Sequence, residues 1–227
     1  RRNRDGGDEA ASHPATRTCN RNQTATSVGR CAVQSRRDNG ARLLAQTIAM
    51  LDSRIQHAAL RQRVVDAAHA ATLIWPGETV AMSGFTGSGY PKAVPQALAA
   101  HIGAAHARGE DFRINLLTGA STAPELDGAL AQVDGLAMRM PFQSDPSARK
   151  LINAGKLDYL DIHLSHVAQH VWFGFYNEID TAVIEVSAIL ADGSLVPTTS
   201  VGNNKTWLDL AKKVIIEVNQ WQPAEML

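Results

Sequence analysis

A glycine-rich stretch between a short apolar run and a proline does most to limit the folds open to this chain. Residues 79–91 read T-V-A-M-S-G-F-T-G-S-G-Y-P, and a helical pattern starts at Lys92. This order predicts a strand, a tight turn and a helix, which is how an open α/β sheet places ligand-handling loops at its strand ends. Gly84, Gly87 and Gly89 let the backbone approach a ligand closely. Their G-x-x-G-x-G spacing fits neither a dinucleotide-binding loop nor a P-loop, so the stretch is either a binding loop or a plain structural turn.

Strands and helices are expected to alternate along the rest of the chain. Apolar runs and alternating patterns predict strands over residues 79–83, 112–117, 135–140, 159–162, 181–189 and 214–218. Helical periodicity predicts helices over residues 58–74, 92–107, 124–131, 147–154, 164–174 and 204–212. Asp192-Gly193 predicts a hairpin turn after the 181–189 strand. The fold class is therefore α/β, with a mostly parallel sheet flanked by helices.

Charge and cysteine content exclude several classes of protein. Lys plus Arg and Asp plus Glu both number 22, so nothing favours a nucleic-acid or membrane surface. No apolar run approaches the roughly 18 residues of a membrane span. The two cysteines, Cys19 and Cys31, lie before the regular part of the sequence and suit neither a disulfide framework nor a zinc site. An intracellular protein is the expectation.

The first 53 residues differ from the rest of the chain. They begin at Arg1 and are rich in Arg, Asn, Ser, Thr and Gly, which predicts a disordered or non-native tail with a short helix over residues 41–51. Acidic residues among them argue against a mitochondrial transit peptide. Residues 54–227 are expected to form one domain, cut before a second half because 222–227 carry no closing element.

Three loops follow predicted strands, over residues 83–90, 118–122 and 141–145. Because the carboxyl ends of parallel strands share one edge of the sheet, these loops should lie together. Their hydroxyls and backbone N–H groups suit a carboxylate or phosphate, but they contain no nucleophile–base pair. Alternatively, the hydroxyls cap helices: Ser144 would cap the helix that follows it, and Thr122 the helix that follows that residue.

Two further sets of residues have both a functional and a structural interpretation. His163, His166 and His170 share one helix face and could bind a metal, although no carboxylate completes a ligand set and ordinary surface histidines are the preferred interpretation. Glu185 lies in an apolar strand, where burial would raise its pKa for catalysis or a neighbouring loop would satisfy it. The G-x-S-x-G motif of serine hydrolases is absent.

Seven motifs follow one another in the regular part of the chain: S-G-F-T-G-S-G-Y-P-K at 83–92, L-T-G-A-S-T at 117–122, P-F-Q-S-D-P at 141–146, H-L-S-H-V-A-Q at 163–169, V-I-E-V-S-A-I at 183–189, S-V-G-N at 200–203 and K-K-V-I-I-E-V-N at 212–219. Taken in this order, the motifs over residues 54–222 resemble the N-terminal half of the acetyl-CoA hydrolase/transferase family, especially its succinyl-CoA:acetate CoA-transferase branch.

The resemblance implies a two-domain enzyme of the class I CoA-transferase type, with an α/β fold in both halves. In that family, a glutamate attacks the acyl-CoA thioester, and the reaction proceeds through a glutamyl-CoA intermediate. That glutamate lies in the C-terminal half, so no catalytic residue is expected in this chain and Glu185 is not the nucleophile. CoA enters as acetyl-, succinyl- or propionyl-CoA, a substrate and not a permanently bound cofactor, and small carboxylates are the other substrates. The resemblance further implies a homodimer at full length, in the cytoplasm or alternatively in mitochondria.

The resemblance also assigns substrate-binding residues by motif position. Ser121, in T-G-A-S-T, and Ser144, in P-F-Q-S-D, would bind the carboxylate, and the arginine that completes the set would fall after residue 227. Contacts from the glycine loop are expected at Gly84, Phe85, Thr86 and Gly87. No metal site is expected. The alternatives are a non-catalytic α/β module that binds a carboxylate or phosphate with the same loops, and an inactive fragment.

Overall fold

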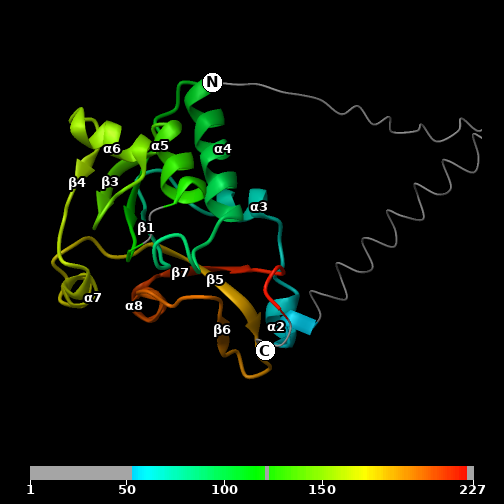
Figure 1. The fold of residues 1–227 in the computed structure, drawn as a ribbon. Helices are drawn as coiled ribbons and strands as arrows, with labels where there is room; N and C mark the ends of the chain where they lie inside the picture. The colour runs from blue at the N-terminus through cyan, green and yellow to red at the C-terminus, as the bar shows by residue number, and fades with distance from the viewer. Residues whose placement is uncertain (1–52, 121–122, 224–227) are drawn as a thin grey trace, which may run out of the picture. The chain divides into compact units, whose positions relative to one another are not determined.

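The computed structural model describes residues 53–120 and 123–223 (Figure 1). Nearly all of the predicted tail, including the short helix expected over residues 41–51, lies outside the described residues. In the described ranges, no helix combines the length and the apolar character needed to cross a membrane.

The described residues form a seven-stranded sheet in the order β4-β3-β2-β1-β5-β6, and β7 also pairs with β5. All pairings are parallel except that of β6 with β5. The strands are β1 Thr79–Met82, β2 Ile114–Leu117, β3 Leu136–Met140, β4 Asp158–Tyr159, β5 Thr181–Ile189, β6 Leu195–Pro197 and β7 Lys213–Val218. The predicted mostly parallel sheet is therefore confirmed.

Strand β5 is the centre of the sheet. All nine of its residues are buried, as its continuous apolar sequence predicts for a strand covered on both faces. Its first half pairs with β1, in the register Val80↔Thr181, and its second half pairs with β6. Gly193 has φ 89° in the turn between β5 and β6, which confirms the predicted hairpin.

Helices cover both faces of the sheet (Figure 1). The side chains of β1 alternate between the two cores: Val80 and Met82 pack in the core that includes α3, α4, α5 and α6, and Ala81 packs in the core that includes α7 and α8. The helices are α2 Ala58–Arg61, α3 Ala67–Thr72, α4 Ala93–Ala107, the π-helix η1 Pro124–Gly128 continuing into α5 Ala129–Gln132, α6 Pro146–Asn153, α7 Leu164–Trp172 and α8 Asn204–Leu210.

The single helix predicted over residues 58–74 is wrong, because the chain forms two short helices there, α2 and α3. The Asp66 carboxylate accepts a hydrogen bond from His69 N at 2.7 Å and so caps a new helix. The preceding Val64 and Val65 are exposed and β-branched, which makes them weak helix formers. The residues whose spacing suggested one helix instead lie in two separate short helices and in the segments beside them.

Candidate functional site

The loops that follow β1, β2 and β3 lie together at the carboxyl edge of the sheet, as predicted. Thr86 N donates to Ala120 O at 2.8 Å, which joins the first loop to the second. Thr118 N donates to Met140 O at 2.9 Å, which joins the second loop to the end of β3. The strands are adjacent and parallel, so their ends emerge side by side.

The glycine loop makes a tight turn whose tip faces solvent. Phe85 and Ser88 exchange backbone hydrogen bonds of 2.7 and 3.0 Å around Thr86 and Gly87, which both have positive φ, 41° and 81°. Gly84 is needed for a different reason, because a Cβ there would lie 2.7 Å from Ser88 O. The exposed residues Phe85, Thr86 and Gly87 are therefore placed to contact a ligand, whereas Gly84 permits the close packing behind them.

A fourth loop, residues 198–203, also lies at this site, although no local pattern in the sequence predicts its position there. Asn203 N donates to Ser83 Oγ at 2.8 Å, and Ser200 Oγ donates to Ser88 O at 2.7 Å. Ser88 Oγ in turn donates to the Thr199 hydroxyl at 2.6 Å. Two of the hydroxyls considered for ligand binding, those of Ser83 and Ser88, are thus engaged in fixing one loop against the other.

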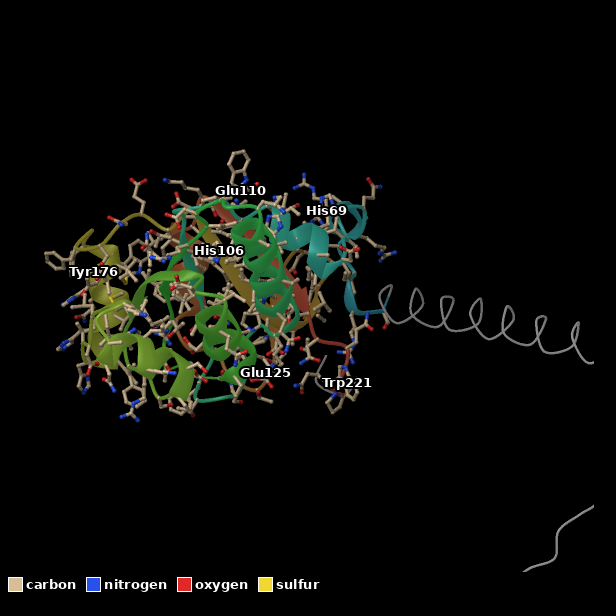
Figure 2. All side chains as sticks on the ribbon, turned by 90° about the horizontal axis from the view of Figure 1, so that it is seen from above. His69, His106, Glu110, Glu125, Tyr176 and Trp221 are labelled. Carbon is tan, nitrogen blue, oxygen red and sulfur yellow. The ribbon has the colours of Figure 1, made fainter. Side chains whose placement is uncertain are left out.

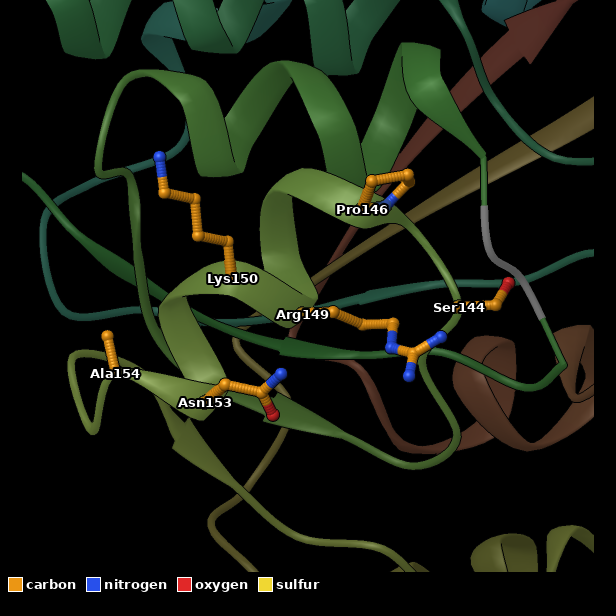
Figure 3. A pocket seen from close by; sticks show the side chains of 6 residues that line it. All are labelled: Ser144, Pro146, Arg149, Lys150, Asn153 and Ala154. Carbon is orange, nitrogen blue, oxygen red and sulfur yellow. The ribbon is translucent and has the colours of Figure 1, made fainter.

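Ser144 is exposed at the edge of a pocket of about 550 Å³ (Figure 3). The interpretation of Ser144 as a helix cap is wrong, because Asp145 caps α6 by accepting from Ser147 N at 2.8 Å and Ala148 N at 3.1 Å. Pro146 occupies the first turn, which makes the residue before it the N-cap. Ser121 and Thr122 lie outside the described residues, so the roles of both stay predictions.

Tyr90, at the end of the glycine loop, is buried and ties the loop to η1. Its hydroxyl donates to Glu125 Oε2 at 2.8 Å. Burial above all, and then the hydrogen bond and charge of Glu125, raises the pKa of Tyr90 well above its ordinary value. The phenol is therefore neutral at physiological pH and serves as a hydrogen-bond donor, not as a base.

Glu185 is 1% exposed and fully engaged by three donors. Its carboxylate accepts from Lys92 Nζ at 2.9 Å, Thr198 Oγ1 at 2.7 Å and Asn219 Nδ2 at 2.7 Å. Satisfaction by neighbouring loops, one of the two interpretations above, is what the structure shows. A carboxylate enclosed in this way connects the start of α4, the 198–203 loop and the end of β7, and is not presented to a substrate.

A second carboxylate, Glu217 of β7, stands in register with Glu185 and caps α4 from a distance in sequence. It accepts from the backbone N–H groups of Lys92, Ala93 and Val94 at 2.7, 3.1 and 2.9 Å. Negative charge is favourable at a helix N-terminus, so this contact fixes where α4 begins and hence where the glycine loop ends.

The three histidines do share one face of α7, as predicted, but their contacts are structural. The ring centroids are 5.5 Å apart for His163 and His166, and 5.9 Å apart for His166 and His170. His163 caps α7, and His170 Nδ1 lies 3.1 Å from the hydroxyl oxygen of Tyr176, the residue labelled in Figure 2. Residues 53–120 and 123–223 contain no group of three or more side chains arranged to hold a metal ion.

Comparisons with known proteins agree with these motifs. Succinyl-CoA:acetate CoA-transferase of Clostridium kluyveri is 42% identical over 175 residues, which cover 77% of this chain and 32% of that protein. Propanoyl-CoA:succinate CoA transferase of Escherichia coli is 45% identical, covering 67% of this chain and 31% of that protein. Acetyl-CoA hydrolase of Schizosaccharomyces pombe is 38% identical, covering 77% and 35%. The chain thus spans about a third of the length of these curated relatives.

Solved structures resemble the fold at low sequence identity. RipA from Yersinia pestis has a TM-score of 0.53 and 18% identity, covering 78% of this chain and 39% of that one. A variant of the decarboxylase AibA/AibB has a TM-score of 0.51 and 14% identity, covering 72% and 79%. These likenesses concern the fold alone, and they agree with the α/β class.

A family model confirms the resemblance to the acetyl-CoA hydrolase/transferase family. The model for the acetyl-CoA hydrolase/transferase N-terminal domain matches residues 49–225, most of the chain. The matched residues include all three strand-end loops and the 198–203 loop. The chain therefore belongs to the acetyl-CoA hydrolase/transferase family, of which it carries the N-terminal domain.

Proposed function

We propose that this chain forms the substrate-binding N-terminal part of an enzyme that transfers CoA between acyl-CoAs and small carboxylates, or that hydrolyses acyl-CoA. The supporting observation is the convergence of the strand-end loops at one edge of the sheet, with Phe85, Thr86, Gly87 and Ser144 exposed there. The relatives named above are two transferases and a hydrolase, so acetyl-, succinyl- or propionyl-CoA with acetate or succinate are the proposed substrates.

In this proposal the chain binds and orients the carboxylate, and does not attack the thioester. Ser144 and, by motif position, Ser121 each offer one O–H donor to the carboxylate oxygens. As the family resemblance implies, the nucleophilic glutamate that forms glutamyl-CoA comes from outside the chain. Glu185 is not that residue in this proposal, because it already accepts three hydrogen bonds in the core. CoA serves as a substrate, and no permanently bound cofactor or metal takes part.

The proposed domain organisation follows from the same assignment. Residues 54–227 form the N-terminal domain, residues 1–53 are a tail outside it, and a C-terminal domain supplies the catalytic half. We expect the chain on its own to be inactive, and the full-length enzyme to be a cytoplasmic homodimer, with a mitochondrial location as the alternative.

The test is reconstitution of activity from two parts. CoA exchange from succinyl-CoA to acetate is measured with the purified chain alone and with an added C-terminal region from the Clostridium kluyveri relative. Activity is expected only in the mixture, and should be lost when Ser121→Ala and Ser144→Ala are combined. Turnover by the chain alone would contradict the external nucleophile. A folded, associated but inactive mixture would instead favour a non-catalytic binding module or an inactive fragment.

A further inference from the structure

The pocket beside Ser144 is lined by one polar face of α6 (Figure 3). Pro146, Arg149, Lys150 and Asn153 follow the i, i+3, i+4, i+7 spacing that brings side chains to the same side of a helix. Among the described residues that line it, none is acidic. The pocket therefore offers hydrogen-bond donors and positive charge together.

The two cationic side chains are not committed elsewhere. Within the part of the chain that the structure describes, neither Arg149 nor Lys150 makes a side-chain hydrogen bond or an ion pair, and both are exposed. Arg108, by contrast, is paired, because its Nε lies 2.7 Å from Glu110 Oε1. Figure 3 shows the Arg149 side chain extending toward Ser144, and Lys150 extending away from it.

The one acidic residue next to Ser144 in sequence does not neutralise this charge. Asp145 is 7% exposed, and its Oδ1 accepts the hydrogen bonds of two backbone N–H groups at the start of α6. Its negative charge is directed to the helix N-terminus, where it is stabilised. The Arg149 guanidinium is left to bind a ligand anion.

We propose that this pocket is an anion subsite in which Arg149 binds a carboxylate or phosphate group next to Ser144. A guanidinium can donate two parallel hydrogen bonds to either group, and Asn153 can add a neutral donor. This arginine lies within the chain, and so differs from the one that the family resemblance places after residue 227. The inference rests on the proposed function, since it names a further contact of the same substrate site.

The charges of the ligand decide which substrates would use this subsite. The pocket of about 550 Å³ is an open depression at the surface, so its volume does not select a ligand by size. The anionic group has two sources among the proposed substrates: the second carboxylate of succinate and the phosphates of CoA. Acetate, with a single carboxylate, should gain least from Arg149.

The experiment is calorimetric titration of the complete 227-residue chain with succinate, acetate and adenosine 3′-phosphate 5′-diphosphate, the nucleotide part of CoA. Arg149→Gln should weaken binding of succinate or of the nucleotide at least about tenfold, as expected for losing a charged hydrogen bond. Lys156→Gln is the matched control, because it removes the same charge outside the lining residues and should change affinity less than about twofold. Binding of only succinate, or of only the nucleotide, identifies the source of the anionic group.

Three results would overturn the subsite: no anion binding by the unmodified chain, no effect of Arg149→Gln, or equal effects of Arg149→Gln and Lys156→Gln. Arg149 is exposed and Gln is a comparable helix former, so the variant should fold, and circular dichroism checks this. The titration needs no catalysis. A chain that binds the anion through Arg149 but restores no activity in the mixture would therefore refute the proposed function and leave the subsite standing.

Discussion

Removing Lys92 should be more damaging to stability than neutralising Glu185, although the two form one ion pair of 2.9 Å. Lys92→Met leaves the Glu185 carboxylate, 1% exposed, with only the neutral donors Thr198 and Asn219. Removing one partner of a buried ion pair typically costs about 3–5 kcal/mol. Two neutral donors remain and the Lys92 side chain is 39% exposed, so we expect the lower end, a loss of about 3 kcal/mol in the free energy of unfolding.

Glu185→Gln is the comparison variant, because it keeps the shape and one acceptor oxygen while removing the charge. The amide can still accept from Lys92, so the expected loss is about 1 kcal/mol. Both values are measured by urea unfolding of the chain, followed by circular dichroism. The variants and the unmodified chain should have the same m-value, so that a shift of the midpoint reports stability alone. A loss below about 1 kcal/mol for Lys92→Met, or a larger loss for Glu185→Gln than for Lys92→Met, would refute the view of Glu185 as a buried charge that depends on its cation.

Two further predictions concern a glycine backbone and the Asp180 carboxylate. Gly202→Ala should destabilise the chain by about 3 kcal/mol, because Gly202 has φ 52° and a Cβ there would lie 2.3 Å from Ser83 Oγ. Gly87→Ala, where φ is 81° but the space around a Cβ is open, should cost only about 1 kcal/mol in the same urea assay. A hydrogen bond from a β1 backbone N–H, and then Lys212, lowers the pKa of Asp180. Asp180 thus adds stability above its unfolded pKa of about 4, which is lost as pH falls through its folded pKa, so Asp180→Asn should flatten the acid side of a stability–pH curve.

Local signals in the sequence predicted most elements of the fold. The mostly apolar run over residues 181–189 predicted the bounds of β5, because a strand that is buried on both faces is made largely of apolar residues. The prediction of one helix over residues 58–74 is wrong because apolar spacing does not mark where a helix begins. Asp66, a good N-cap ahead of an alanine-rich segment, is the signal for a second helix. The alternative interpretation of Ser144 as the cap of α6 is wrong for a related reason, because the residue directly before the proline, Asp145, is the better candidate.

Contacts between distant segments could not be predicted in this way. Glu217 caps α4 although more than 120 residues separate it from Lys92, and Asn203 binds Ser83 across 120 residues. No local pattern marks either contact, because each depends on the order of strands in the sheet. The hairpin at Asp192-Gly193 was the only local hint, since it returns the chain along β5 to the edge where the glycine loop lies.

These distant contacts divide the strand-end hydroxyls into two roles. Ser83 and Ser88 are engaged by the 198–203 loop, so the back of the glycine loop is fixed. With its back fixed, the loop can hold Thr86 at φ 41°, a conformation that residues other than glycine seldom adopt. The exposed tip is thereby positioned before any ligand arrives, which lowers the entropic cost of orienting a substrate. The exposed residues Thr86 and Ser144 should then be better placed to bind a substrate than Ser83 and Ser88.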